Sequence, residues 1–428
     1  MSQKLEHADE KFAEKATKQS EKGQYFTPKI VADRLAMDLK ELSQQSISVV
    51  HDLGCGPGAL SAAVLRNHSD IRIRGYDIDD SAISDYNRRF PDFGSATNLD
   101  LLINPEIGPI PAAISNPPYL TSRKLGPERT KEIRDTGYFT AVKGKLNTFS
   151  LFIELAIKEL EEGGVAAFIV PIAITNLKDH RALRNMLLSE CDEIRLTWLK
   201  ESNCFKDQNV EVNACLISFR KGADEAILEI REWNGEMIVR SEQIDPTKYD
   251  FFPTLTFIEL PVQQGESLDT EFEVIAIGFN WKKGWEEFVS NSNQDEYNKA
   301  LLPIVRGKDV SKEGKLQLNS SLNYKFLKKN GWIDRSCDYE LHSSKRPRLI
   351  LADITSGIKV AFTESPCLPM NSVKVIYHKE NDKSKLKKLR SYLMSEDAHL
   401  RLKEATPNLH LPKGNLERLK IPDWSESE

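Results

Sequence analysis

The chain has 428 residues, 40% of them hydrophobic and 29% charged, so it can bury the cores of two or three ordinary domains. No run of about 18 apolar residues occurs, which excludes a membrane-spanning helix. Residues 1–20 are charged and lack the apolar centre of a signal peptide, so we expect a short N-terminal arm. The six cysteines form no C-x-x-C pair, and no histidine stands at zinc-ligand spacing. We therefore expect no metal site and a cytoplasmic location.

The net charge of −5 hides an uneven distribution along the chain. Residues 1–222 are close to neutral, at −2, and residues 223–300 carry 6 Lys and Arg against 17 Asp and Glu. Residues 301–420 carry 24 Lys and Arg against 13 Asp and Glu, a net charge of +11. One interpretation is chance variation on solvated faces. The other is a basic lobe that faces phosphate groups, because Lys and Arg that neutralise phosphates supply most of the affinity for nucleic acid.

The first half of the chain alternates short apolar runs with amphipathic stretches, which is typical of βαβ units around a mostly parallel sheet. The apolar runs predict strands at Ile47–His51, Ile71–Tyr76, Ala112–Ser115, Val165–Val170, Ile194–Leu199 and Ala214–Phe219. The amphipathic stretches predict helices at Pro28–Leu39, Ala59–Asn67, Asn147–Glu161 and Asn176–Leu188. We expect an α/β fold with helices on both faces of the sheet.

After about residue 225 this rhythm stops, and short elements lie between polar loops. The predicted elements are β-like runs and one helix, at Ala226–Glu229, Phe272–Ile277, Arg348–Ala352, Ser372–Tyr377 and Lys383–Leu393. This pattern favours a second domain of mixed α+β type, with a boundary between residues 222 and 255. We place the first domain at residues 21–235 and the second at residues 236–428.

A glycine-rich loop follows the first predicted strand, in the sequence Asp52-Leu-Gly54-Cys-Gly56-Pro-Gly58. Glycines there let the backbone approach a ligand at the carboxyl end of the strand, where open α/β sheets bind cofactors. A tight turn without a ligand would have the same appearance. Asp77 ends the next strand at the distance expected of an acid that accepts ribose hydroxyls. Because the loop lacks the spacing of a dinucleotide site, a nucleoside-like cofactor fits better than NAD.

The strongest signal is Ser-Asn116-Pro117-Pro-Tyr119, directly after the apolar run Ala112–Ile114. Two consecutive prolines end a sheet ladder and hold the chain extended. The side-chain carbonyl of Asn116 and the backbone carbonyl of Pro117 would then point at one place, which suits a planar amino group. Tyr119 offers a ring face for a planar base. The alternative is a rigid loop with a tyrosine in the core.

The order of these motifs resembles the amino-methyltransferases, and within them the gamma-class adenine-N6 DNA methyltransferases of the TaqI type. The resemblance covers about residues 20–222 with specific motifs. It implies S-adenosylmethionine as the cofactor and a Rossmann-like class I methyltransferase sheet. A DNA target-recognition domain would follow that sheet.

The resemblance also implies roles for individual residues. Tyr25 and Thr27 match the opening segment that caps the methionine end of the cofactor. Asp52, Gly54, Gly56 and Gly58 match the cofactor loop, Asp77 the ribose-binding acid and Asp100 the acid at the cofactor adenine. For Asp100 a plain cap at a strand end stays open. Asn116 contacts both cofactor and target amine in this family, and Pro117 and Tyr119 complete the catalytic loop.

Phe205 stands where the family has a second aromatic residue, which stacks on the flipped adenine opposite Tyr119; on its own it would be read as a core residue. In the second half, 303–307, 346–350 and 410–416 are similar to recurring segments of target-recognition domains. The basic residues that we expect to contact DNA phosphates are Arg306, Lys308, Lys345, Arg346 and Arg348.

We predict an enzyme that methylates N6 of a flipped-out adenine in double-stranded DNA. It would be the modification enzyme of a restriction-modification system, a monomer beside a separate restriction endonuclease. Glutamine-N5 methyltransferases of release factors and RNA methyltransferases share the N-P-P-[YF] motif, but those chains are usually shorter and lack a long basic second domain. A third alternative is an inactive methyltransferase fold retained to bind DNA, against which the complete motifs argue.

Overall fold

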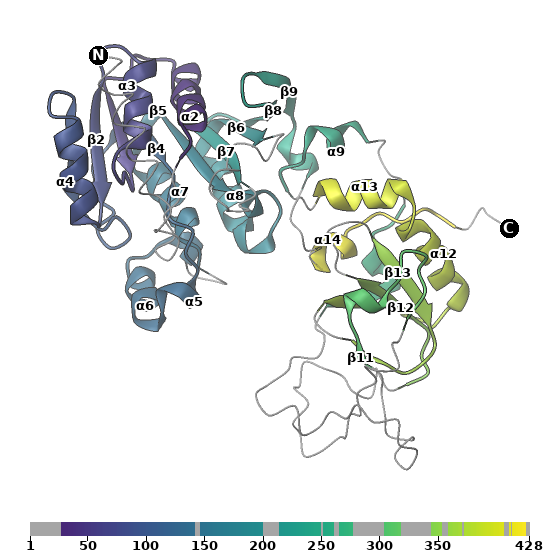
Figure 1. Ribbon diagram of the computed structural model, residues 1–428. Coiled ribbons are helices and arrows are strands. Elements are labelled where there is room, and N and C mark those ends of the chain that lie inside the picture. The colour runs from purple at the N-terminus through teal and green to yellow at the C-terminus, as the bar shows by residue number, and fades with distance from the viewer. Residues whose placement is uncertain are drawn as a thin grey trace. The chain divides into compact units, whose positions relative to one another are not determined.

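The computed structural model describes residues 27–141, 146–199, 214–249, 251–260, 265–276, 304–317, 344–352, 358–369, 372–405, 411 and 413–424 (Figure 1). The chain divides into two units, residues 1–255 and 256–428. Helix α9 (Leu255–Glu259) spans this division in the sequence. In the described ranges, no helix has the length and apolarity that crossing a bilayer requires.

The first unit is built around a mixed sheet, in which the described residues form nine strands. Their order across the sheet is β3 (Gly94–Asn98), β2 (Arg72–Asp77), β1 (Val49–Leu53), β4 (Ile110–Ser115), β5 (Leu160–Pro171), β7 (Ala214–Lys221), β6 (Cys191–Leu199), β8 (Ile227–Trp233) and β9 (Ile238–Ile244). The pairs from β3 to β5 are parallel, whereas β7 is antiparallel to both β5 and β6. Since parallel strands end at one edge, the loops after β1, β2, β3 and β4 come together there.

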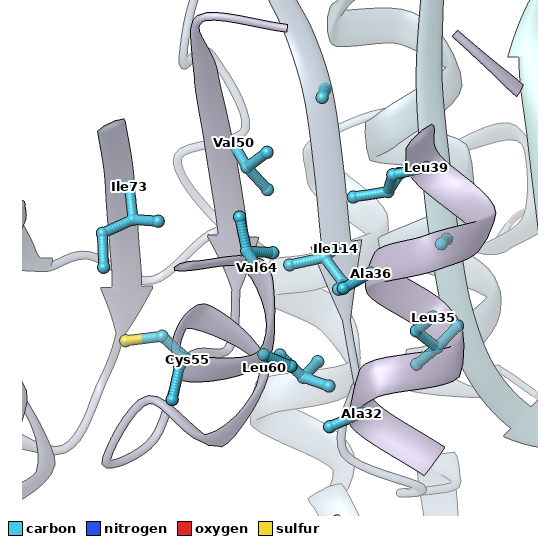
Figure 2. Close-up of a cluster of buried hydrophobic side chains, with 14 of the residues drawn as sticks. Ala32, Leu35, Ala36, Leu39, Val50, Cys55, Leu60, Val64, Ile73 and Ile114 are labelled. Atoms are coloured by element: carbon cyan, nitrogen blue, oxygen red, sulfur yellow. The ribbon is translucent and has the colours of Figure 1, made fainter. Parts of the chain in front are cut away.

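Helices cover both faces of this sheet. On one face lie α2 (Lys29–Leu42), α3 (Ala59–Asn67) and α4 (Asp80–Arg89), whose apolar side chains share one core with the strands. Figure 2 shows Leu39 of α2 turned toward the strands that carry Ile114 and Val50. Helices α7 (Thr148–Glu159) and α8 (Arg181–Glu190) contact β5 and β6 and lie outside that core, on the opposite face. Between β4 and α7 the chain forms two short helices, α5 (Ser122–Leu125) and α6 (Pro127–Asp135).

A buried group of charges joins α2 to the far part of the sheet. Asp38 on α2 is fully buried and accepts from Arg34 at 2.8 Å, and it lies 3.3 Å from Arg231 on β8. Glu41 contacts the same two guanidinium groups, at 2.5 and 3.3 Å. Arg34 on α2 and Glu229 on β8 complete the group, so loss of Arg231 would leave the acids of α2 with fewer positive partners.

The first unit extends beyond the predicted domain end at residue 235. Ile238–Ile244 pairs antiparallel with β8, so the chain continues the same sheet, and the unit ends at Leu255. The four helices and six strands predicted for this half are present with ends shifted by a few residues. Strand β3 ends at Asn98, which places Asp100 in the following turn.

The second unit contains a smaller antiparallel sheet. Among its described residues the strand order is β10 (Phe272–Ile275), β15 (Val373–His378), β12 (Arg348–Ala352) and β13 (Lys359–Thr363), with β11 (Ile304–Val305) and β14 (Leu368–Pro369) paired separately. Its helices are α10 (Leu268–Glu271), α12 (Lys383–Leu393), α13 (Glu396–Ala405) and α14 (Lys413–Glu417). Leucines of α12, α13 and α14 pack with β10, β12 and β15 in one core.

Arg348 begins β12 and is fully buried, which corrects its predicted role as a phosphate contact. Its guanidinium donates to the backbone carbonyls of Ser344 and Arg346 and to the hydroxyl of Tyr377, the last at 3.1 Å. The bonded groups lie inside the unit, so this side chain supports the fold of the second unit.

We predict that Arg348→Ala lowers the free energy of unfolding of the second unit by on the order of 2–4 kcal/mol, because it leaves a cavity and removes the donor from buried acceptors. Lys345→Ala, at an exposed position three residues earlier, should change it by less than about 0.5 kcal/mol. Urea unfolding followed by circular dichroism measures both. Equal stability of the two variants would contradict the structural role of Arg348.

Candidate active site

The glycine-rich loop after β1 is held against the end of β2. Gly54, Gly56 and Gly58 all have positive φ angles, +75°, +49° and +86°, which favour glycine. A Cβ at Gly58 would overlap the ring of Phe90, whereas a Cβ at Gly56 would meet none of the described atoms within 4 Å. The loop is therefore closed toward the protein core at Gly58 and open at Gly56, as a close approach of a ligand requires.

Asp77 at the end of β2 links this loop to the turn that follows β2. One carboxylate oxygen accepts from the backbone N–H of Gly56 at 2.8 Å, and the other accepts from Asp79 at 3.0 Å. Each oxygen keeps a second lone pair for a ligand hydroxyl. The next residue, Ile78, is 67% exposed although it is large and apolar. An exposed isoleucine beside Asp77 fits the face of a flat apolar group, and sequence reasoning missed it although it directly follows the strand-end acid.

Asp100 lies next to this position, in the turn after β3. The backbone of Leu99 donates to the Asp77 carbonyl at 2.9 Å, and the Asn98 side chain donates to the Ile78 carbonyl at 3.3 Å. These bonds hold the turn beside the end of β2. A nucleoside therefore has acceptors for its hydroxyls at Asp77, an apolar surface at Ile78 and a carboxylate at Asp100, which is a fitting set of groups.

Asp52 is buried beneath the loop, 1% exposed, and not on the loop surface. Its carboxylate accepts from the backbone and hydroxyl of Ser61 at 3.1 and 2.7 Å, near the start of α3. Burial raises the pKa of Asp52 to about 7 against the effect of these bonds, and the charge of Asp77 adds to the rise. In the structure the side chain of Asp52 therefore joins the glycine-rich loop to α3 and does not line the loop surface.

The Asn116–Tyr119 loop after β4 is fixed by Thr148 at the start of α7. The Thr148 hydroxyl donates to the carbonyl of Pro118 and accepts from the backbone N–H of Leu120 at 2.9 Å. The backbone N–H of Thr148 in turn donates to the Leu120 carbonyl at 2.9 Å. Sequence reasoning missed Thr148 as the residue that holds this loop, although it lies at the start of the helix predicted at Asn147–Glu161.

The amide of Asn116 is held in one orientation. Its Nδ2 donates to the Thr27 hydroxyl at 2.9 Å, and its Oδ1 accepts from the Tyr119 hydroxyl at 3.1 Å. That hydroxyl also lies 3.1 Å from the carbonyl of Ile169 on β5, so one proton is shared between two acceptors. Since the nitrogen of the amide faces Thr27, the oxygen is the atom presented on the other side.

Beneath Tyr119 lies a buried aromatic series. The Tyr119 and Phe149 rings meet edge to face at 6.3 Å, and Phe149 contacts the ring of His180 at 4.8 Å. Burial, with Arg184 adding to the effect, lowers the pKa of His180 to about 4, so its ring is neutral at neutral pH. A neutral, buried support keeps the tyrosine ring in place without adding charge to the site.

The remaining predicted site residues belong to the second unit or are not described. Tyr25 and Phe205 are outside the described residues. Lys308 and Lys345 are exposed in the second unit. Arg306 is half-buried, with its guanidinium 3.4 Å from Asp309, and Arg346 is half-buried over the Tyr377 ring.

Two family models match the first half of the chain. Residues 86–205 match the Eco57I restriction-modification methylases, and residues 32–137 match the methyltransferase small domain. Among curated relatives, the type II methyltransferase M.AccI of Acinetobacter calcoaceticus is 24% identical over 167 residues, 39% of this chain and 31% of that protein. The modification methylase CviBIII of Paramecium bursaria Chlorella virus NC1A is 24% identical over 177 residues, 40% of this chain and 44% of that protein. The chain thus spans less than half the length of these relatives.

Solved structures share the fold at low identity. The type IIG restriction endonuclease BpuSI matches 94% of this chain and 59% of its own, with a TM-score of 0.50 and 14% identity. The DrdV–DNA complex matches 82% of this chain and 48% of its own, with a TM-score of 0.52 and 11% identity. Together with the family models, the described sheet confirms the predicted class I methyltransferase fold, whose cofactor is S-adenosylmethionine.

We predict that the free energy of unfolding falls by about 3 kcal/mol between pH 5 and pH 8 because of the titration of Asp52 alone. The pKa of its carboxyl is about 7 in the folded chain against an ordinary value of 3.8, so the folded chain binds more protons over this range. The contribution is complete below about pH 4 and lost as the pH passes 7. Urea unfolding of the Asp52→Asn variant should show that much less pH dependence than the original chain. The same slope in both proteins would contradict the raised pKa.

Proposed function

We propose that this chain, whose residues 86–205 match the restriction-modification methylase family, methylates N6 of a flipped-out adenine in double-stranded DNA. The observation that carries the proposal is the fixed Asn116 amide at the end of β4. Its nitrogen is held by Thr27, so its oxygen is the atom that can accept from a donor beside the cofactor loop. An amino group is a donor of this kind, and it is the group that such an enzyme alkylates.

The chemistry follows from the two carbonyl oxygens of the loop. The exocyclic amine of adenine is conjugated and therefore planar and poorly nucleophilic. When Asn116 Oδ1 and the Pro117 carbonyl accept its two N–H groups, electron density on nitrogen increases and the lone pair is oriented for attack. S-adenosylmethionine would supply an electrophilic methyl group here, and its C–S bond would break as the N–C bond forms, with S-adenosylhomocysteine as the leaving group. An amide is too weak a base to keep the proton that the product releases, so that proton passes to water.

The adenine must leave the duplex to reach this loop, because its amine is stacked inside the helix. The ring of Tyr119, supported by Phe149, is the described surface on which the extruded base would stack. We further propose Phe205 for the opposite face of the base and Tyr25 for the methionine end of the cofactor. In this proposal the chain is the modification enzyme that acts beside a separate restriction endonuclease.

The features of the second unit favour a DNA duplex as the substrate over a protein or a short RNA. It has its own hydrophobic core and several exposed lysines, Lys308 and Lys345 among them, within the basic segment 301–420. A separate unit of this kind is what a methyltransferase needs to hold and read the duplex around the flipped base. A glutamine-N5 methyltransferase has no such requirement.

We predict that Asn116→Ala abolishes methyl transfer and leaves cofactor affinity within a few-fold, because Asn116 holds the target amine. Asp77→Ala should do the reverse and weaken cofactor binding most, since it removes acceptors for the ribose. Calorimetry measures affinity, and transfer of a tritiated methyl group to plasmid DNA measures activity. Mass spectrometry of the digested DNA should find N6-methyldeoxyadenosine. N4-methylcytosine instead, or near-normal turnover of Asn116→Ala, would overturn the assignment.

We also predict that neutralising Lys308 and Lys345 weakens binding to all DNA sequences alike. The slope of log affinity against log salt should flatten by roughly 0.9 for each phosphate group that the variant no longer neutralises. Adding Arg306→Ala and Arg346→Ala should have a smaller effect, because both guanidinium groups already have partners in the fold. Lys40→Gln on α2 is the control. An unchanged slope in the double lysine variant would place the phosphate-binding residues elsewhere.

A further inference from the structure

The helices α5 and α6 follow the Asn116–Tyr119 loop in the chain, and this segment contacts the turn that carries Asp100. Arg129 on α6 forms an ion pair with Asp100 through Nη2, and its Nη1 donates to Glu132 at 3.1 Å. After α6 the chain returns, and the buried hydroxyl of Tyr138 donates to the Leu101 carbonyl at 2.9 Å. The turn after β3 is thus bound to this segment at two adjacent residues.

The carboxylate of Asp100 is oriented from two sides. Oδ2 accepts from Arg129, and Oδ1 accepts from the backbone N–H of Leu102 at 3.1 Å. A carboxylate with one donor on each oxygen cannot rotate without breaking a bond. Each oxygen still has a second lone pair, so a further donor can approach only along a fixed direction.

That direction matters because of the neighbouring apolar surface. Ile78 is exposed at the end of β2, and the hydrogen bond from Asn98 to its carbonyl ties it to the Asp100 turn. A purine lying on Ile78 would bring its edge toward Asp100. The exocyclic amine of adenine donates at that edge, whereas hypoxanthine has a carbonyl oxygen there, which a carboxylate repels.

We propose that Arg129 is a positioning residue that makes this site selective for an adenine base in the cofactor, an inference that rests on the proposed function. Arg129 acts through Asp100, because it fixes the carboxylate where the amino group of adenine meets it. Without the guanidinium, Asp100 rotates and its charge is less well placed, so the advantage of adenine over hypoxanthine is reduced.

The test measures binding of two cofactor products to the full chain by calorimetry, without DNA. S-adenosylhomocysteine and S-inosylhomocysteine differ only in the group at position 6 of the purine and in the associated ring proton. The original chain should prefer the adenosine compound. Arg129→Ala should reduce this preference roughly tenfold, mainly by weakening binding of the adenosine compound, since its hydrogen bond to a charged group no longer has the optimal geometry.

Two further variants separate positioning from general stability. Arg129→Lys keeps a positive charge that can donate to Asp100, so it should retain part of the preference for the adenosine compound. It provides the test if the alanine variant folds poorly. Arg123→Ala removes an exposed cation from the same pair of helices and should leave the preference unchanged. An unchanged preference in both Arg129 variants, with Asp100→Ala reducing it, would overturn the inference. Failure of the original chain to bind S-adenosylhomocysteine would instead overturn the proposed function, and the inference with it.

Discussion

The site depends on how the two prolines of the Asn116–Tyr119 loop are held. Proline has no N–H to donate to a neighbouring strand, so the sheet cannot fix this segment. The hydroxyl of Thr148 replaces the missing ladder, because it bonds Pro118 and Leu120 from the first turn of α7. Asn116 can therefore be aligned by Thr27 on one side and Tyr119 on the other. Thr27 and Thr148 come from distant parts of the chain, and the loop is the point at which they meet.

Local pattern was sufficient to predict the parallel part of the sheet and the edge at which the candidate site lies. Gly54 and Gly58 are examples. Their φ angles are positive and a side chain at Gly58 would overlap its neighbours, so few residues other than glycine can occupy these positions. The Pro-Pro step carries a comparable local constraint. Constraints of this kind act within a few residues, so the α/β pattern could be predicted from sequence alone, whereas the class I methyltransferase fold was implied by the family resemblance.

Contacts between distant residues could not be predicted in this way. Arg348 has the positive charge expected of a phosphate contact, and only its tertiary neighbours show that it is buried against Tyr377. Asp52 matches a cofactor motif, yet its depth beneath the loop depends on the packing of α3. Thr148 and Arg129 have no unusual sequence context, and their importance lies in partners about 30 residues earlier in the chain. The roles predicted for residues 25 and 205 stay predictions, since both lie outside the described residues.

The buried charges between α2 and β8 have a consequence for exchanging recognition halves between related enzymes. Arg231 lies after all the recognised motifs of the first half, yet Asp38 near the start of the chain lies 3.3 Å from it. A chimera joined near residue 222 would replace β8 and β9, and the buried Asp38 would then keep Arg34 but lose the guanidinium of Arg231. The natural joint lies after Ile244, where the last strand of the sheet ends. A transplanted second half would thus have to leave β8 and β9 with the domain that contains the candidate site.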